Sequence, residues 1–119
     1  MDLIKHIQEY DSKKIVIRQY NEFKTIDYKD IFSFYSDKRD IYCKTKDGEF
    51  KIKNTLNELE KIDDFLRISR SSIVNIKHIE SFDIGETGKL IVKLDNGTEE
   101  IVSRRKVKEI MKYIRERSL

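Results

Sequence analysis

The feature that most restricts the fold of this chain is a succession of short runs in which apolar and polar residues alternate, separated by polar breaks. The clearest two runs, residues 41–46 and 49–53, flank Asp47-Gly48. This dipeptide is typical of a type I′ turn, whose two central residues take positive φ, so the pair is predicted to form a β-hairpin. The other strand-like runs cover residues 14–20, 23–28, 30–35, 65–68, 80–84, 89–94 and 99–102.

Four segments instead have spacings that suit helical turns. Near the C-terminus, apolar residues at i, i+3, i+4 and i+7 predict an amphipathic helix from about residue 104 onward. They are Val107, Ile110, Met111 and Ile114. Thr55 and Glu58 have the spacing of a capping box, which predicts a short helix within residues 54–62. A short helix over residues 2–9 and one helical turn within residues 73–79 are also expected.

Length and composition limit the chain to one domain. It has 119 residues, of which 38% are hydrophobic and 39% charged, with no proline and only four glycines. A second core would not be stable at this length, and the composition argues against disorder. We therefore expect a mainly β domain over residues 14–119, with about eight to ten short strands, one or two short helices and a C-terminal helix. Residues 1–13 are expected to form an N-terminal segment that precedes this domain.

Several classes of protein are excluded by what the sequence lacks. No apolar run approaches the length of a membrane span, and the first residues carry no signal-peptide pattern, so a cytoplasmic protein is expected. Cys43 is the only cysteine, which excludes a disulfide scaffold. His6 and His78 have no cysteine or carboxylate at the spacing of a zinc site. We expect no enzyme activity, no metal and no cofactor.

The net charge of +3 is unevenly distributed. Residues 1–60 hold twelve Lys or Arg and twelve Asp or Glu, whereas residues 61–119 hold thirteen and ten. Residues 67–77 contain three basic residues and no acid, and residues 101–108 contain four and no acid. An anionic partner would be attracted to such clusters, but on charge alone a solvated basic surface is the better explanation, because lysine-rich surfaces are common.

The residues before the last helix carry the strongest indication of an anionic partner. Ser103 is suited to be its N-cap, yet Arg104, Arg105 and Lys106 follow in the first turn. Cations at this end oppose the helix dipole and cost about 0.3–1 kcal/mol each. A docked anion would reverse the sign of that interaction. The alternative is that the helix begins later and the basic run is a solvated loop.

Two further loops share this basic character. Within Ser69-Arg70-Ser71-Ser72, the hydroxyls and the arginine suit contacts to phosphate and to base edges. The alternative is a turn in which a serine caps the next short helix. Lys38-Arg39 is a third basic loop. Its alternative is internal pairing with the flanking Asp37 and Asp40. Three basic loops between strands favour a β scaffold that presents loops to nucleic acid.

Two motifs are specific in combination: Phe65-Leu66-Arg67-Ile68-Ser69-Arg70-Ser71-Ser72-Ile73-Val74-Asn75, and later Val102-Ser103-Arg104-Arg105. With them the sequence resembles the LytTR DNA-binding domain of bacterial transcription regulators. The resemblance extends from about residue 14 to residue 114 and includes the Asp30-Ile31 strand, the Asp47-Gly48 hairpin and the Thr55-Leu56 helix. Between the two motifs it also includes Ile79 and Gly88-Lys89-Leu90. The resemblance implies an elongated arrangement of short antiparallel sheets that inserts loops into successive DNA grooves.

The resemblance also implies which residues touch DNA. Base-reading positions would be the Lys38-Arg39-Asp40 loop, Arg70 and Arg105. Neighbouring contacts, mainly to phosphate, would be Ser69, Ser71, Arg104 and Lys106. Arg67 matches the arginine of the motif, with internal pairing as its alternative role, and Lys77 and Ser103 complete the predicted site. Ser69 stands where many members have histidine, and Arg39 or Asp40 replaces a histidine of the first loop, departures that bear on base preference.

Members of the family usually serve as output domains of response regulators in two-component systems, and some stand alone. A receiver domain would need about 120 further residues. The chain is therefore expected to be either a free-standing regulator or the C-terminal part of a longer one. The promoters bound by the family typically carry direct repeats, so two copies on adjacent sites of double-stranded DNA are expected. The competing readings are a non-catalytic protein-interaction module with solvated basic loops, and an RNA or single-strand binder that uses exposed aromatic residues.

Overall fold

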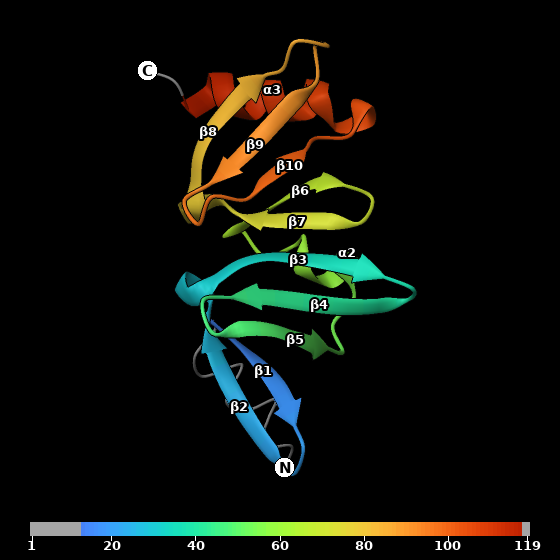
Figure 1. Cartoon of the computed structure of the whole chain (residues 1–119), viewed down its shortest axis with the longest axis vertical. Coiled ribbons are helices and arrows are strands. Elements are labelled where there is room, and N and C mark those ends of the chain that lie inside the picture. Colours follow the sequence, from blue (N-terminus) through green and yellow to red (C-terminus); the bar gives the residue numbers. More distant parts are fainter. Residues whose placement is uncertain (1–12, 118–119) are drawn as a thin grey trace.

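The computed structural model describes residues 13–117 and has three antiparallel sheets arranged along its longest axis (Figure 1). One sheet has two strands, β1 (Lys14–Gln19) and β2 (Glu22–Asp27). The central sheet has five, in the order β5 (Gly48–Ile52), β4 (Asp40–Thr45), β3 (Ile31–Asp37), β7 (Ser72–Asn75) and β6 (Phe65–Ser69). The third contains β10 (Glu99–Ile101), β9 (Leu90–Leu94) and β8 (Ile79–Ile84). The prediction of a mainly β, elongated fold is confirmed, with principal extents of 50 × 31 × 23 Å.

Both expected helices of the main domain are present. Helix α2 (Leu56–Leu59) begins after Thr55, whose hydroxyl accepts a hydrogen bond from the amide of Glu58 at 3.1 Å, as the capping box predicts. Helix α3 (Arg104–Arg117) covers the third sheet and buries Ile110 completely. The helix expected over residues 2–9 lies outside the described residues.

The prediction of a helical turn within residues 73–79 is only half right. Ser72–Asn75 is the strand β7, and a 3-10 turn, η2 (Ile76–His78), follows it. Strand β7 lies between β3 and β6 and is buried along its whole length. A strand that is buried on both faces shows no apolar–polar alternation, so its sequence resembles a buried helical turn.

The hairpin at Asp47-Gly48 forms, but its turn differs from the prediction. Thr45 pairs with Gly48, so Lys46 and Asp47 are the turn residues, and neither has positive φ. Gly48, with φ +128°, is instead the first residue of β5. The two-residue turn with positive φ at both positions is at Lys38 and Arg39, between β3 and β4.

Two hydrophobic cores lie on opposite faces of the central sheet. The first contains Phe34 and Leu59 and is shared with β1 and α2, and the second contains Val92 and Ile110 and is shared with the third sheet and α3. Adjacent residues of β7 contribute to both, because successive side chains of a strand point to opposite faces. Ile73 lies in the first core and Val74 in the second. No helix within residues 13–117 is long and apolar enough to cross a membrane.

Candidate nucleic-acid interface

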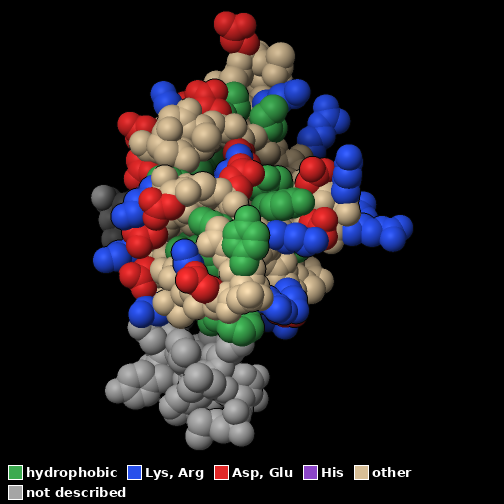
Figure 2. Space-filling model, turned by 60° about the horizontal axis from the view of Figure 1, so that its bottom comes forward, with side chains coloured by type: hydrophobic (Ala, Val, Ile, Leu, Met, Phe, Trp, Pro, Cys, Tyr) green, Lys and Arg blue, Asp and Glu red, His purple; other side chains and the backbone are tan. Residues whose placement is uncertain are grey.

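Three basic segments lie on one side of the elongated molecule. The β3–β4 turn, the β6–β7 turn and the start of α3 follow one another along this side in Figure 1. Figure 2 shows lysine and arginine side chains that project beyond the same right-hand edge. The fold thus brings together three loops that are separated by roughly thirty residues each in the sequence, and we call this side the basic edge.

The β3–β4 turn presents two exposed cations on a strained backbone. Lys38 has φ +50° and Arg39 has φ +77°, a combination that type I′ turns usually assign to asparagine and glycine. For other residues, the left-handed region costs about 1–2 kcal/mol each. The expected pairing of the flanking aspartates with these cations is absent from the described residues, since Asp40 binds Lys51 at 3.1 Å. The turn is therefore kept at a cost to stability, and both cations remain available to a ligand.

The β6–β7 turn is braced from inside by Arg67. The Arg67 guanidinium donates from Nε to the carbonyl of Ser69 at 3.0 Å, from Nη1 to Asn57 Oδ1 at 2.9 Å, and from Nη2 to the carbonyl of Arg70. It also lies 3.4 Å from a carboxylate oxygen of Glu60. Only 15% of this side chain is exposed. Arg67 therefore pairs internally, which is the alternative role given for it in the sequence analysis, and it fixes the position from which Arg70 projects.

The same turn is tied to the strand that leads into the first basic turn. The amide of Ser36 donates to the carbonyl of Ser71 at 2.9 Å, and the amide of Ser71 donates to Ser69 Oγ at 3.3 Å. Ser72 donates from its hydroxyl to Glu100 Oε1 at 3.1 Å, which links the turn to β10. These bonds fix the β6–β7 turn relative to both neighbouring elements.

Helix α3 begins at Arg104, directly after Ser103, as predicted. The Ser103 carbonyl accepts the first helical bonds, from the amides of Lys106 at 2.9 Å and Val107 at 3.2 Å. The Ser103 amide donates to the carbonyl of Ile68 at 2.9 Å, which anchors the start of α3 to β6. Its hydroxyl makes no capping hydrogen bond within the described residues. The reading in which the helix begins later is therefore wrong.

A single hollow of about 350 Å³ joins the β6–β7 turn to the start of α3. It is lined by polar and charged residues: Asn57, Glu60, Arg67, Ser69, Arg70, Ser103, Arg105 and Lys106. Lys106 pairs with Glu109 at 3.2 Å, one helical turn further on. Across residues 13–117, no carboxylate pairs with Arg39, Arg70, Arg104 or Arg105. These guanidiniums can each bind an external anion without breaking an internal ion pair.

Lys77 lies elsewhere. It belongs to η2, which follows the end of β7 remote from the basic turn, and it lines a different hollow with Asp63 and Asp64. The neighbouring His78 faces inward, with Nδ1 at 2.9 Å from Asp95 Oδ2 and Nε2 against the carbonyl of Lys29. The fold separates Lys77 from the other predicted site residues, because a four-residue strand intervenes.

Sequence reasoning missed the residues that hold the site in shape. Asn57 and Glu60 of the α2 region bind Arg67, although nothing in their spacing indicated this. Asn75, which is 1% exposed, donates through Nδ2 to the carbonyls of Tyr28 and Ile31 at 2.9 and 2.8 Å. Asn75 ends the motif that resembles the family, but neither that motif nor its place in an apolar run indicated which carbonyls it binds. Within residues 13–117, no group of three or more metal-binding side chains occurs.

Comparisons with known proteins agree with the fold. The family model of the LytTr DNA-binding domain matches residues 21–115. Among solved structures, the LytTr DNA-binding domain of a putative methyl-accepting/DNA response regulator from Bacillus cereus is similar, with a TM-score of 0.77 and 20% sequence identity. The match covers 86% of this chain and 96% of that chain. The search of curated proteins finds no match.

Proposed function

The chain belongs to the LytTR DNA-binding domain family, whose members bind DNA and regulate transcription, and on that premise we propose that its basic edge reads a specific duplex sequence. The observation that carries the proposal is the hollow that Arg70 and Arg105 both line, each without a carboxylate partner in the described chain. Both are anchored on rigid elements, since Arg67 braces one and α3 carries the other.

Arg70 and Arg105 are the base-reading residues in this proposal. A guanidinium can donate two parallel hydrogen bonds to guanine O6 and N7 in the major groove. Lys38 and Arg39 project from a separate turn along the same edge and enter a neighbouring groove. The contacts would therefore extend along the axis of the duplex over more than one groove.

The remaining polar residues of the edge position the protein on the DNA backbone. Ser69, Ser71, Arg104 and Lys106 surround the two arginines and are suited to phosphate contacts. Ser103 places the start of α3, and Arg67 acts through the turn that it braces. Lys77 lies outside this surface and contributes only to the general electrostatic attraction.

The proposal extends to the cellular role. The domain acts as a transcription regulator without catalytic activity, in the cytoplasm of a bacterium. It serves either alone or as the output part of a response regulator in a two-component system. Two copies bind adjacent direct repeats.

The test is a selection from random duplexes, followed by salt titration on the enriched site. Enrichment of a direct repeat is expected, with log K falling by about 0.9 per log unit of salt for each phosphate neutralised. Arg70→Ala and Arg105→Ala should each weaken binding by about 1–3 kcal/mol and relax base preference at one position. Arg115→Ala, in the last turn of α3, is the matched control and should change neither.

Two results would contradict the proposal. If no sequence is enriched and binding shows no salt dependence, the basic edge is a solvated surface and the domain is a protein-interaction module. If Arg70→Ala weakens binding to all duplexes equally, Arg70 is a phosphate contact and does not read a base. A comparison of Lys77→Ala with Arg115→Ala decides whether Lys77 touches the DNA.

A further inference from the structure

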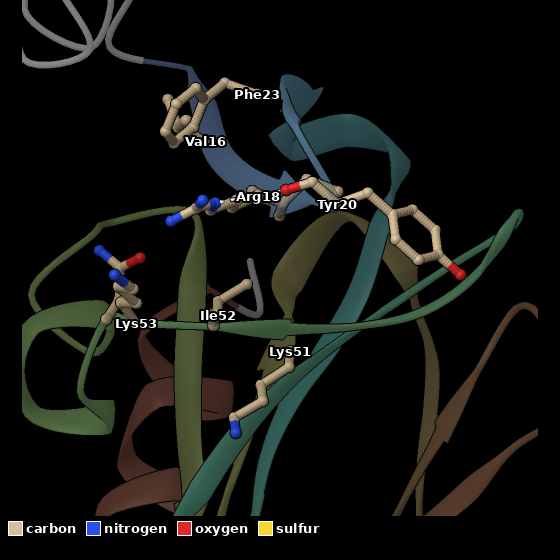
Figure 3. A pocket seen from close by; sticks show the side chains of 9 residues that line it. Val16, Arg18, Tyr20, Phe23, Lys51, Ile52 and Lys53 are labelled. Atoms are coloured by element: carbon tan, nitrogen blue, oxygen red, sulfur yellow. Dashed lines mark hydrogen bonds between the residues drawn. The ribbon is translucent and has the colours of Figure 1, made fainter.

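A second surface feature lies at the end of the molecule opposite to α3. There a groove of about 620 Å³ opens between the β1–β2 ribbon and β5. Its apolar side chains come from both sides: Val16 and Phe23 from the ribbon, and Ile52 from β5 (Figure 3). Phe23 is 59% exposed, and Figure 2 shows hydrophobic side chains gathered at the centre of this face. Phe23 and the half-buried Val16 form its exposed apolar part, because Ile52 is only 6% exposed. An occupant that covered them would remove this apolar area from water.

The charges around the groove restrict what the occupant can be. Arg18, Lys51 and Lys53 line it, and its described lining contains no carboxylate. In Figure 3, Arg18 extends between the apolar side chains of the ribbon and those of β5. Its guanidinium lies 5.8 Å from the ring centre of Phe23, and Lys51 is bound to Asp40 at 3.1 Å. An occupant with apolar side chains and a net negative charge would fit this surface.

The chain itself contains such a segment directly before β1. Residues 1–12 carry Leu3, Ile4 and Ile7 at the spacing of one helical face, and three acids, Asp2, Glu9 and Asp11, against one lysine. Twelve residues reach about 18 Å as a helix, similar to the roughly 20 Å length of a six-residue strand such as β1. Because the segment is joined to the ribbon, its effective concentration at the groove is on the order of millimolar.

We propose that residues 1–12 occupy this groove, with Leu3, Ile4 and Ile7 packed against the apolar side chains of the ribbon and β5. The acids of the segment then lie near Arg18 and Lys53. The N-terminal segment in this way covers Phe23, which is 59% exposed, at the edge of the first hydrophobic core. The proposal does not depend on how the basic edge binds DNA.

The experiment compares two triple variants of the full 119-residue chain by amide NMR and hydrogen exchange. Leu3→Ser/Ile4→Ser/Ile7→Ser removes the apolar side chains. Lys5→Ser/His6→Ser/Gln8→Ser changes the same number of positions among the polar residues and is the matched control. We expect the first variant to shift the amide resonances of the groove and to speed their exchange about tenfold. The control should leave them in place.

Amides in the second core, at Leu94 and Ile110, report whether each variant is folded, and they should be unchanged in both. If the triple variant does not fold, the single change Ile7→Ser gives the same test with a smaller loss. Groove resonances that respond equally to both variants would overturn the proposal. Resonances that move with protein concentration would also overturn it, because the occupant would then be a second copy of the chain.

Discussion

The substitution Arg67→Lys tests whether Arg67 supports the DNA-binding turn or touches DNA directly. The substitution keeps the positive charge but replaces a planar fork of five donors by a single ammonium group. Arg67 bonds to the carbonyls of Ser69 and Arg70 and to the side chain of Asn57. An ammonium at the end of a flexible stem cannot satisfy all three acceptors at once.

The magnitude follows from the bonds that are lost. With two of the three hydrogen bonds broken, at about 1 kcal/mol each in a partly exposed site, the free energy of unfolding should fall by about 2 kcal/mol. The freed turn must be ordered again when DNA binds, at a cost of about 1–2 kcal/mol per residue. Affinity for the specific site should therefore fall roughly tenfold, since 1.4 kcal/mol corresponds to a factor of ten.

The assay measures urea denaturation and the salt dependence of DNA binding for Arg67→Lys and Arg67→Gln. Both variants should lose stability and affinity, while the slope of log K against log salt stays as in the unsubstituted protein. Arg104→Gln is the comparison, because loss of its proposed phosphate contact would reduce the slope by about 0.9. Near-normal affinity in Arg67→Lys, or a reduced slope in Arg67→Gln, would refute the reasoning and make Arg67 a direct contact.

Three further predictions concern the scaffold. Replacing Lys38-Arg39 by Asn-Gly should raise the free energy of unfolding by about 2–4 kcal/mol, because it relieves positive φ at two residues. The same change should weaken DNA binding and its salt dependence, and denaturation and salt titration would measure both effects. Asn75→Ala should lower the free energy of unfolding by about 2–4 kcal/mol, since two buried carbonyls lose their donor, and an unchanged urea midpoint would contradict this. Burial raises the pKa of the Cys43 thiol from its ordinary value of 9.0 to about 12. The contribution of the Cys43 thiol to stability is therefore complete below pH 9 and is lost as the pH rises toward 12. Denaturation curves of Cys43→Ala should not show this loss. Alkylation of Cys43 at pH 8 should proceed only at the rate of unfolding.

The turns show where local reasoning succeeded and where it failed. The alternating runs around Asp47-Gly48 predicted the hairpin correctly, because strand periodicity is a property of consecutive residues. The predicted turn type was wrong, since Gly48, the residue with positive φ, is the first residue of β5 and not a residue of the turn. The type I′ conformation occurs instead at Lys38 and Arg39, where no local preference favours it. Two pairing strands and their packing impose that conformation on residues that disfavour it.

The sequence by itself determined the β class, most strand positions, the start of α3 at Arg104 and membership of the family. The strands and the helix could be predicted because alternation and helical spacing are properties of residues that are close in the chain. The tertiary structure alone decided that Arg67 points inward, that Lys77 lies away from the basic edge, and that the three basic segments share one side. Those outcomes depend on hydrogen bonds between distant residues, including Ser36 with Ser71 and Ser103 with Ile68. Such bonds form only when packing brings the partners together, so no local pattern in the sequence records them.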